Sequence, residues 1–203
     1  MLNAVLLYNC LEVAAGCSSC IGMSLTSGFE CGWCDRPSGM TGTCSFIEDC
    51  SSQNLVTTGS QCPMPTIDNF DPEFGPPEGG TTIIITGTNL GVSFSDFAED
   101  SIQVGGVNCI PEDSDSYEPG RRISCTTTNS TMSTAVMITL SNGATSSGQT
   151  LFTRVSPRVT GVFPLRGPQA GGTNLIVYGT NLDIGNTEDT TITLVGGTEC
   201  TVK

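Results

Sequence analysis

The chain has 203 residues, including 11 Cys, 25 Gly, 11 Pro and no His, and its 20 acidic and 7 basic residues give a formal charge of −13. The lack of histidine excludes Ser-His-Asp triads, Cys-His dyads and histidine-containing zinc motifs, and no carboxylates are paired so as to tune one another. The acidic balance argues against nucleic acid as a partner. Because the motifs of catalytic and metal sites are missing, we expect no enzyme, cofactor, metal or small-molecule substrate.

The two ends of the chain lack the features of a complete secreted protein. The apolar stretch within Met1–Tyr8 is short and has no basic segment before it, so it does not have the pattern of a signal peptide. No stretch reaches the roughly 18 apolar residues of a membrane span. Because Cys200 also stands near the end without an obvious partner, we expect a piece of a longer extracellular protein.

Eight cysteines crowd the first 62 residues. Dense, even-numbered cysteines are typical of a secreted disulfide scaffold, in which each bridge adds roughly 2–4 kcal/mol to a unit too small for a sufficient core. Spacing alone does not choose among the pairings. The eight are Cys10, Cys17, Cys20, Cys31, Cys34, Cys44, Cys50 and Cys62.

A zinc site is the rival interpretation of these cysteines. Cys17-x2-Cys20 and Cys31-x2-Cys34 resemble the paired knuckles of a four-cysteine zinc site, but the gap between them is short and four cysteines would be left over. A Cys-x2-Cys redox site would need βαβ surroundings that are missing here. Disulfides are therefore favoured. Trp33 is expected to pack between bridges, with an exposed binding anchor as the alternative.

The chain contains an internal repeat. Shifted by 92 residues, 65–90 and 157–182 share 12 identities, including Gly-Gly-Thr and Gly-Thr-Asn-Leu motifs. A module thus begins near Pro65 and again near Pro157, and the second copy reaches about half its length. Cys200 then corresponds to Cys109, and a mate corresponding to Cys125 would lie beyond the end. A reactive free thiol is the alternative.

The module has the pattern of an all-β domain. Its runs are short, rich in β-branched residues and separated by turn residues, which predicts an immunoglobulin-like β-sandwich. Asn142-Gly143 predicts a hairpin with a type I′ turn, which needs positive φ at both central residues. Strands are expected at Thr82–Thr86, Ile102–Val104, Arg122–Cys125, Ala135–Leu140 and Leu151–Val155.

Three polar segments carry weaker signals. Residues 75–81 form a Gly/Pro-rich turn without the Gly-Lys-Ser/Thr of a phosphate loop. The acidic group at 112–118 does not specify a calcium site and is expected to be a solvated loop; it comprises Glu112, Asp113, Asp115 and Glu118. Asn129-Ser130-Thr131 is the only Asn-x-Ser/Thr sequon and a candidate glycosylation site.

The motifs together resemble two extracellular domain families. Four motifs resemble the PSI (plexin-semaphorin-integrin) domain: Tyr8-Asn9-Cys10, Cys17-x2-Cys20, Cys31-Gly32-Trp33-Cys34 and Cys62-Pro63. Pro72-x2-Gly75-Pro76-x2-Gly79-Gly80-Thr81 and Gly87-Thr88-Asn89-Leu90-Gly91 resemble the IPT/TIG domain. A PSI domain followed by tandem IPT domains is the stalk arrangement of plexins, and also of the hepatocyte growth factor receptor group.

The resemblance implies a mainly β fold with three parts. A small disulfide-rich, cysteine-knot-like PSI domain would occupy 8–63. An immunoglobulin-like IPT/TIG sandwich would occupy 64–156, and the N-terminal half of a second, truncated one would occupy 157–203. Similarity to plexins further implies the bridges Cys10–Cys31, Cys17–Cys62, Cys20–Cys44, Cys34–Cys50 and Cys109–Cys125.

The resemblance also implies a function. Plexins are single-pass semaphorin receptors, so the chain would be a non-enzymatic, extracellular stalk fragment that spaces and orients a ligand-binding head. A semaphorin-type protein would bind a part of the receptor outside this chain, and the receptor could also self-associate. The alternatives are the stalk of a hepatocyte growth factor receptor-like tyrosine kinase, an adhesive or matrix protein that reuses these modules, and a cytosolic zinc-binding module.

Overall fold

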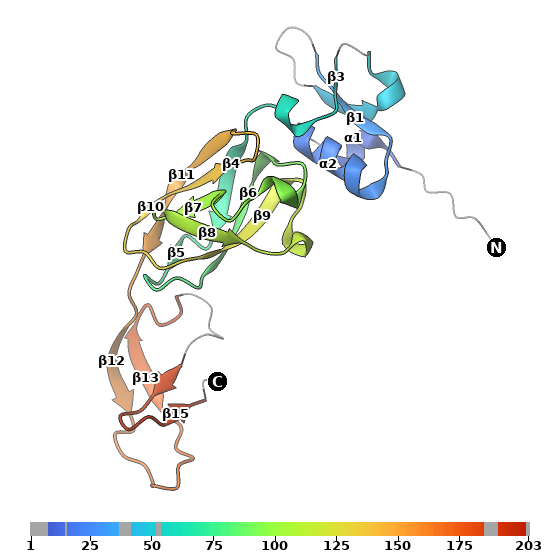
Figure 1. Ribbon diagram of the computed structural model, residues 1–203. Coiled ribbons are helices and arrows are strands. Elements are labelled where there is room, and N and C mark those ends of the chain that lie inside the picture. Colours follow the sequence, from blue (N-terminus) through green and yellow to red (C-terminus); the bar gives the residue numbers. More distant parts are fainter. Residues whose placement is uncertain (1–7, 15, 37–41, 52–53, 185–190, 202–203) are drawn as a thin grey trace, which may run out of the picture.

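The structure, a computed structural model, describes residues 8–14, 16–36, 42–51, 54–184 and 191–201. The apolar stretch noted within Met1–Tyr8 lies outside these residues except for Tyr8. A head (residues 8–63), a first sandwich (residues 64–156) and a C-terminal segment (residues 157–203) follow one another in an elongated arrangement (Figure 1). Within the described part of the chain, no helix has the length and apolarity needed to cross a bilayer.

The head combines two helices with a small antiparallel sheet. Helix α2 ends where Gly28 adopts the left-handed conformation at φ 68°, a C-cap that glycine accepts because it has no Cβ. The sheet has the strand order β2-β1-β3. The elements are α1 (Cys10–Val13), α2 (Cys17–Ser27), β1 (Cys31–Cys34), β2 (Thr43–Phe46), η1 (Ile47–Asp49), β3 (Leu55–Val56) and η2 (Gly59–Gln61).

Cystine sulfur replaces aliphatic side chains in the core of the head. Five of its nine buried core residues are cysteines, and Trp33 joins them with 8% of its surface exposed. Trp33 therefore packs among the bridges, as the sequence predicted, and is not an exposed binding anchor. The other three are Ala14, Ile21 and Val56.

Eight strands of the first sandwich are hydrogen-bonded in the order β4-β6-β9-β8-β7-β10-β11-β5. The short β7–β8 hairpin joins the two layers, whose inner faces share one core. The strands are β4 (Thr66–Asp71), β5 (Phe74–Gly75), β6 (Thr82–Leu90), β7 (Ile102–Val104), β8 (Val107–Pro111), β9 (Gly120–Thr127), β10 (Thr134–Thr139) and β11 (Thr145–Arg154). Two short helices, η3 (Phe94–Asp96) and η4 (Ser114–Ser116), lie in the connections.

The burial of the strands explains why this sequence forms a sandwich. In β6, Ile83 and Ile85 are fully buried while Ile84 is 39% exposed, which is the two-residue alternation of a sheet with one covered face. The opposite layer supplies Val136, Ile138 and Phe152, all fully buried. The predicted immunoglobulin-like sandwich is confirmed.

The Asn142-Gly143 hairpin forms, but its predicted turn type is wrong. Gly143 has φ 83°, whereas Asn142 is not among the residues with positive φ, so a type I′ turn is ruled out. The Gly143 N–H donates to the Leu140 carbonyl, and the Leu140 N–H donates to the Ala144 carbonyl. This is a longer loop closed by a left-handed glycine. The Asn142 side chain accepts from the Ala144 N–H at 2.9 Å and stabilises that conformation.

The C-terminal segment reproduces the first hairpin of the sandwich. Strands β12 (Arg158–Phe163) and β13 (Ile176–Thr180) pair with the register of β4 and β6 shifted by 92 residues, including the irregularity at the third position. Strands β14 (Ile192–Thr193) and β15 (Glu199–Cys200) form a second, short hairpin. The side chains that would face a core are exposed: Val159 and Val162, which correspond to the buried Ile67 and Phe70 of the first sandwich, are 57% and 36% exposed.

We expect a broad-specificity protease to degrade residues 157–203 well before residues 8–156. Exposed apolar side chains and few tertiary contacts lower the free energy of local unfolding, which admits the protease. Mass spectrometry of the fragments over time would identify the surviving core. Equal lifetimes for the two parts would contradict the prediction.

Candidate functional site

Four of the five disulfides lie in the head, which lacks a large apolar core, and the fifth is buried in the core of the first sandwich. The structure pairs the cysteines as the resemblance implies, with Cα atoms 5.5–5.7 Å apart, the separation that a bridge requires. The pairs are Cys10–Cys31, Cys17–Cys62, Cys20–Cys44, Cys34–Cys50 and Cys109–Cys125.

The four cysteines of the rival zinc pattern do not converge on one point. Cys17, Cys20, Cys31 and Cys34 each bond to a different partner. No group of three or more potential metal ligands occurs among the residues that the structure describes. Cys200 is half-buried in β15, and no described cysteine pairs with it.

The Cys17–Cys62 bridge stands at the exit of the head. Cys17 begins α2, and Cys62 lies four residues before β4, where the chain enters the first sandwich. The bridge therefore ties the helix to the segment that leaves the head. Its sequence separation of 45 is the largest of the five.

Helix α2 packs directly on the end of the first sandwich. A Cβ placed on Gly22 would overlap the Cβ of Pro119 and the carbonyl oxygen of Val92, so only glycine permits this approach. Gly120 has φ 70°, and its Cβ position lies beside the backbone of Ser19. We call this contact the junction; it comprises Ser18, Ser19, Gly22 and Gly59 of the head and Asn89, Val92, Pro119 and Gly120 of the sandwich.

Asn89 of the sandwich caps helix α2 of the head. The N-cap residue of α2 is Gly16, which has no side chain to bind the free N–H groups of the first turn. The Asn89 Oδ1 accepts from the Ser18 N–H at 3.3 Å, across 71 residues of sequence. This bond satisfies a helix-terminal donor in the way that a local N-cap side chain would. The first turn of α2 therefore depends on the sandwich.

The loop before β9 places the sandwich side of the junction. The Tyr117 hydroxyl donates to the Leu90 carbonyl at 3.1 Å, and the Gly120 N–H donates to that hydroxyl at 3.4 Å. The Tyr117 ring meets Phe97 edge-on at 5.7 Å between centroids. Burial raises the pKa of Tyr117 above its ordinary value of 10.0, despite the Gly120 N–H bond that opposes this shift, so the hydroxyl stays protonated and can donate.

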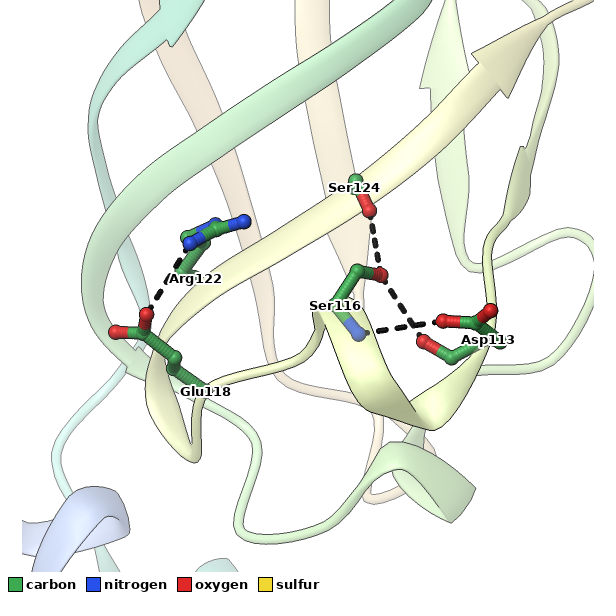
Figure 2. Close-up of polar contacts among 5 residues, drawn as sticks. All are labelled: Asp113, Ser116, Glu118, Arg122 and Ser124. Atoms are coloured by element: carbon green, nitrogen blue, oxygen red, sulfur yellow. Dashed lines mark hydrogen bonds and ion pairs between the residues drawn. The ribbon is translucent and has the colours of Figure 1, made fainter.

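Polar contacts stiffen the same loop on both sides of its tip. Arg122 and Glu118 form an ion pair at 3.2 Å, and Ser116 links Asp113 to Ser124 through hydrogen bonds (Figure 2). Both members of the ion pair are more than a third exposed, so it adds at most a few tenths of a kcal/mol, roughly 0.3–0.5. The conformation of this loop therefore depends more on the Tyr117 contacts and the Gly120 turn than on the ion pair.

The predicted solvated acidic loop is wrong for one of its members. Glu112 is half-buried, and its carboxylate accepts from three hydroxyls at 2.8–3.1 Å. These belong to Thr82, Ser124 and Thr126, on two neighbouring strands that the sequence places far from Glu112. Asp113 caps η4 through the Ser116 N–H. Glu112 and these three hydroxyls form a structural network on the sheet, whereas Asp113, Asp115 and Glu118 are exposed.

Arg154 holds the opposite end of the sandwich, a role that its residue type and position did not indicate. Its guanidinium donates to the carbonyls of Pro76 and Thr128, each at 2.9 Å, and lies 4.9 Å from the centre of the Phe152 ring. Burial lowers the pKa of Arg154 below its ordinary value. The clamp draws two loops together beside the exit to the C-terminal segment. Asn129 is exposed next to Thr128.

The junction and the disulfides together fix how the head meets the sandwich. A groove of about 290 Å³ borders the junction at Gly59 and Asn89, and its lining also includes Leu140 and Asn142. The geometry binds a cross-linked head to a packed sandwich through a glycine-lined contact and a shared helix cap.

Comparison with known proteins agrees with this architecture. The IPT/TIG domain family matches residues 65–153 and 157–203. Plexin-2 of Caenorhabditis briggsae is 34% identical over 202 residues, covering 98% of this chain and 10% of that protein. Plexin-B2 of Mus musculus is 37% identical over 193 residues, covering 94% of this chain and 10% of that protein. The chain thus spans about a tenth of these relatives.

A solved structure shares the fold. The structure described as the Plexin A4 full extracellular region matches with a TM-score of 0.69 and 32% sequence identity, over 89% of this chain and 16% of that chain.

Proposed function

Since the chain belongs to the plexin family, with a disulfide-rich N-terminal region and IPT/TIG domains, we propose that it is a non-enzymatic spacer in the stalk of a semaphorin receptor. It would hold a ligand-binding part of the receptor at a fixed distance and orientation. The junction carries this proposal, because a spacer transmits orientation only if successive parts are packed together and not merely linked.

The proposal extends to domain boundaries, partners and location. We assign residues 8–63 to a PSI domain, 64–156 to a first IPT/TIG domain and 157–203 to the N-terminal half of a second. A semaphorin-type protein would bind elsewhere on the receptor, outside the cell, and the receptor could also self-associate. Membership of the plexin family favours this role over a tyrosine-kinase receptor stalk or a matrix protein.

A distance measurement tests the spacer role. Labels would be attached to noncanonical side chains at Ser27 of the head and Gln149 of the sandwich, both exposed, so that the cysteines stay oxidised. Double electron-electron resonance should give one narrow distance distribution. A broad distribution would show that the head swings freely and would overturn the proposal.

An extracellular location also predicts a glycan at Asn129. Asn129 and Thr131 of the sequon are both exposed, whereas the Ser130 hydroxyl donates to the Gly105 carbonyl at 2.9 Å. Secretion from a eukaryotic host should yield a product that loses mass on treatment with peptide N-glycosidase. The Asn129→Gln variant should show no loss, and an unmodified parent chain would contradict the prediction.

A further inference from the structure

We propose that the asparagine of the Gly-Thr-Asn-Leu motif is the residue that couples each IPT module to the part of the chain before it. This inference deepens the spacer role proposed above and rests on it. The two residues are Asn89 and Asn181, which occupy the same position in the repeat.

The two asparagines share an unusual backbone conformation. Asn89 has φ 55° and Asn181 has φ 57°, and they are the only non-glycine residues with positive φ among those the structure describes. Asparagine tolerates the left-handed region better than most residues, but a left-handed non-glycine residue still points to a constraint. In each copy the asparagine directly follows the last residue that pairs with the other strand of the hairpin, Thr88 in one copy and Thr180 in the other.

Each amide then reaches backward along the chain. The Asn89 Oδ1 accepts from the Ser18 N–H of the head at 3.3 Å. The Asn181 Nδ2 donates to the Ser156 carbonyl, at the end of the first sandwich, also at 3.3 Å. The preceding parts differ, a helix in one case and an extended linker in the other. One amide carries both a donor and an acceptor, so the same residue can serve both.

The neighbouring residues keep the amide in place in both copies. A Cβ on Gly87 would overlap the Thr66 carbonyl oxygen, and a Cβ on Gly179 would overlap the equivalent Arg158 carbonyl oxygen. The two strands of each hairpin therefore approach closely just before the asparagine. The motif builds a fixed corner from which the side chain projects.

The chemistry of the two bonds makes a sharp test possible. An aspartate keeps an acceptor oxygen but has no N–H donor, so Asn89→Asp should preserve its bond while Asn181→Asp should lose its own. A glycine keeps the left-handed backbone but removes the side-chain amide. Asn89→Gly and Asn181→Gly should therefore each lose the one side-chain hydrogen bond of that asparagine, without backbone strain.

The experiment uses the complete chain with label pairs at Ser27 and Gln149, and at Gln149 and Thr160. Asn89→Gly should raise about fivefold the population of molecules whose head is undocked from the sandwich, as reported by the Ser27–Gln149 distance. This is the expected effect of losing one helix-capping bond. Asn89→Asp should leave that pair narrow. Asn181→Gly and Asn181→Asp should broaden only the distance distribution between Gln149 and Thr160. Trp33 fluorescence and circular dichroism would verify folding of each variant.

The outcomes separate this inference from the spacer role. A broad first pair in the parent chain overturns the spacer role and the inference together. If the Ser27–Gln149 distance distribution is narrow in the parent chain and stays narrow in Asn89→Gly, the inference is overturned and the spacer role stands. If the Gln149–Thr160 distance distribution is already broad in the parent chain, or is unchanged by Asn181→Gly, the inference is overturned for the connection between the first sandwich and the C-terminal segment.

Discussion

Replacing Cys17 and Cys62 together by serine should destabilise the head more than any other single disulfide loss. The bridge closes a loop with a sequence separation of 45, for which the chain-entropy relation gives about 4 kcal/mol. Small domains are stable by only about 5–15 kcal/mol, and this head has few apolar side chains to compensate. We therefore expect a head that is largely unfolded near body temperature.

The single tryptophan makes the measurement specific. Trp33 lies in the head core, so its fluorescence during urea unfolding follows the head, while circular dichroism in the far ultraviolet follows mainly the strands of the sandwich. The Trp33 transition should move to lower urea, and the sandwich transition should remain. The matched control is the pair Cys34→Ser and Cys50→Ser, whose separation of 16 gives about 3 kcal/mol by the same relation.

Two results would contradict this prediction. An unchanged Trp33 transition would show that the bridge does not limit the unfolded head. A parallel loss of the sandwich transition would show that head and sandwich unfold as one unit, although their cores are separate clusters.

The strands of the sandwich were predictable because their pattern is local. Thr82–Thr86 is a β-branched run, and strand β6 contains it with alternate residues buried. The repeat was likewise visible as identities at fixed spacing, and the paired registers of β4–β6 and β12–β13 follow it. One signal is a local run and the other is a motif that recurs along the chain, and both are visible without knowledge of which distant residues come into contact.

Helix α2 was missed because its determinants lie elsewhere in the chain. Its sequence, CSSCIGMSLTS, is rich in Cys, Ser and Gly and has no strong apolar stripe. Bridges to Cys44 and Cys62, together with the cap from Asn89, hold it instead. The hydroxyls around Glu112 and the Arg154 clamp are also long-range contacts, across up to 78 residues. Residue types alone do not reveal such pairings.

Replacing Gly22 by alanine should undock the head without unfolding it. Alanine is favoured over glycine in a helix interior by about 1 kcal/mol, so α2 itself should become more stable. At the junction the new Cβ would overlap Pro119 and the Val92 carbonyl oxygen, and overpacking of this kind costs about 1–3 kcal/mol. Because the overlap includes backbone, a side-chain rotation cannot relieve it. The two effects act on different parts of the molecule.

Two measurements distinguish undocking from unfolding. In Gly22→Ala the distance distribution between Ser27 and Gln149 should broaden, while the Trp33 unfolding transition stays constant or moves to higher urea. Gly16→Ala is the control, because its Cβ would lie 3.9 Å from the Asn89 Oδ1, an ordinary contact. That variant should keep the narrow distribution. If Gly22→Ala also stayed narrow, the close approach of α2 to the sandwich would not set the orientation of the head, and disulfides with the linker alone would have to do so.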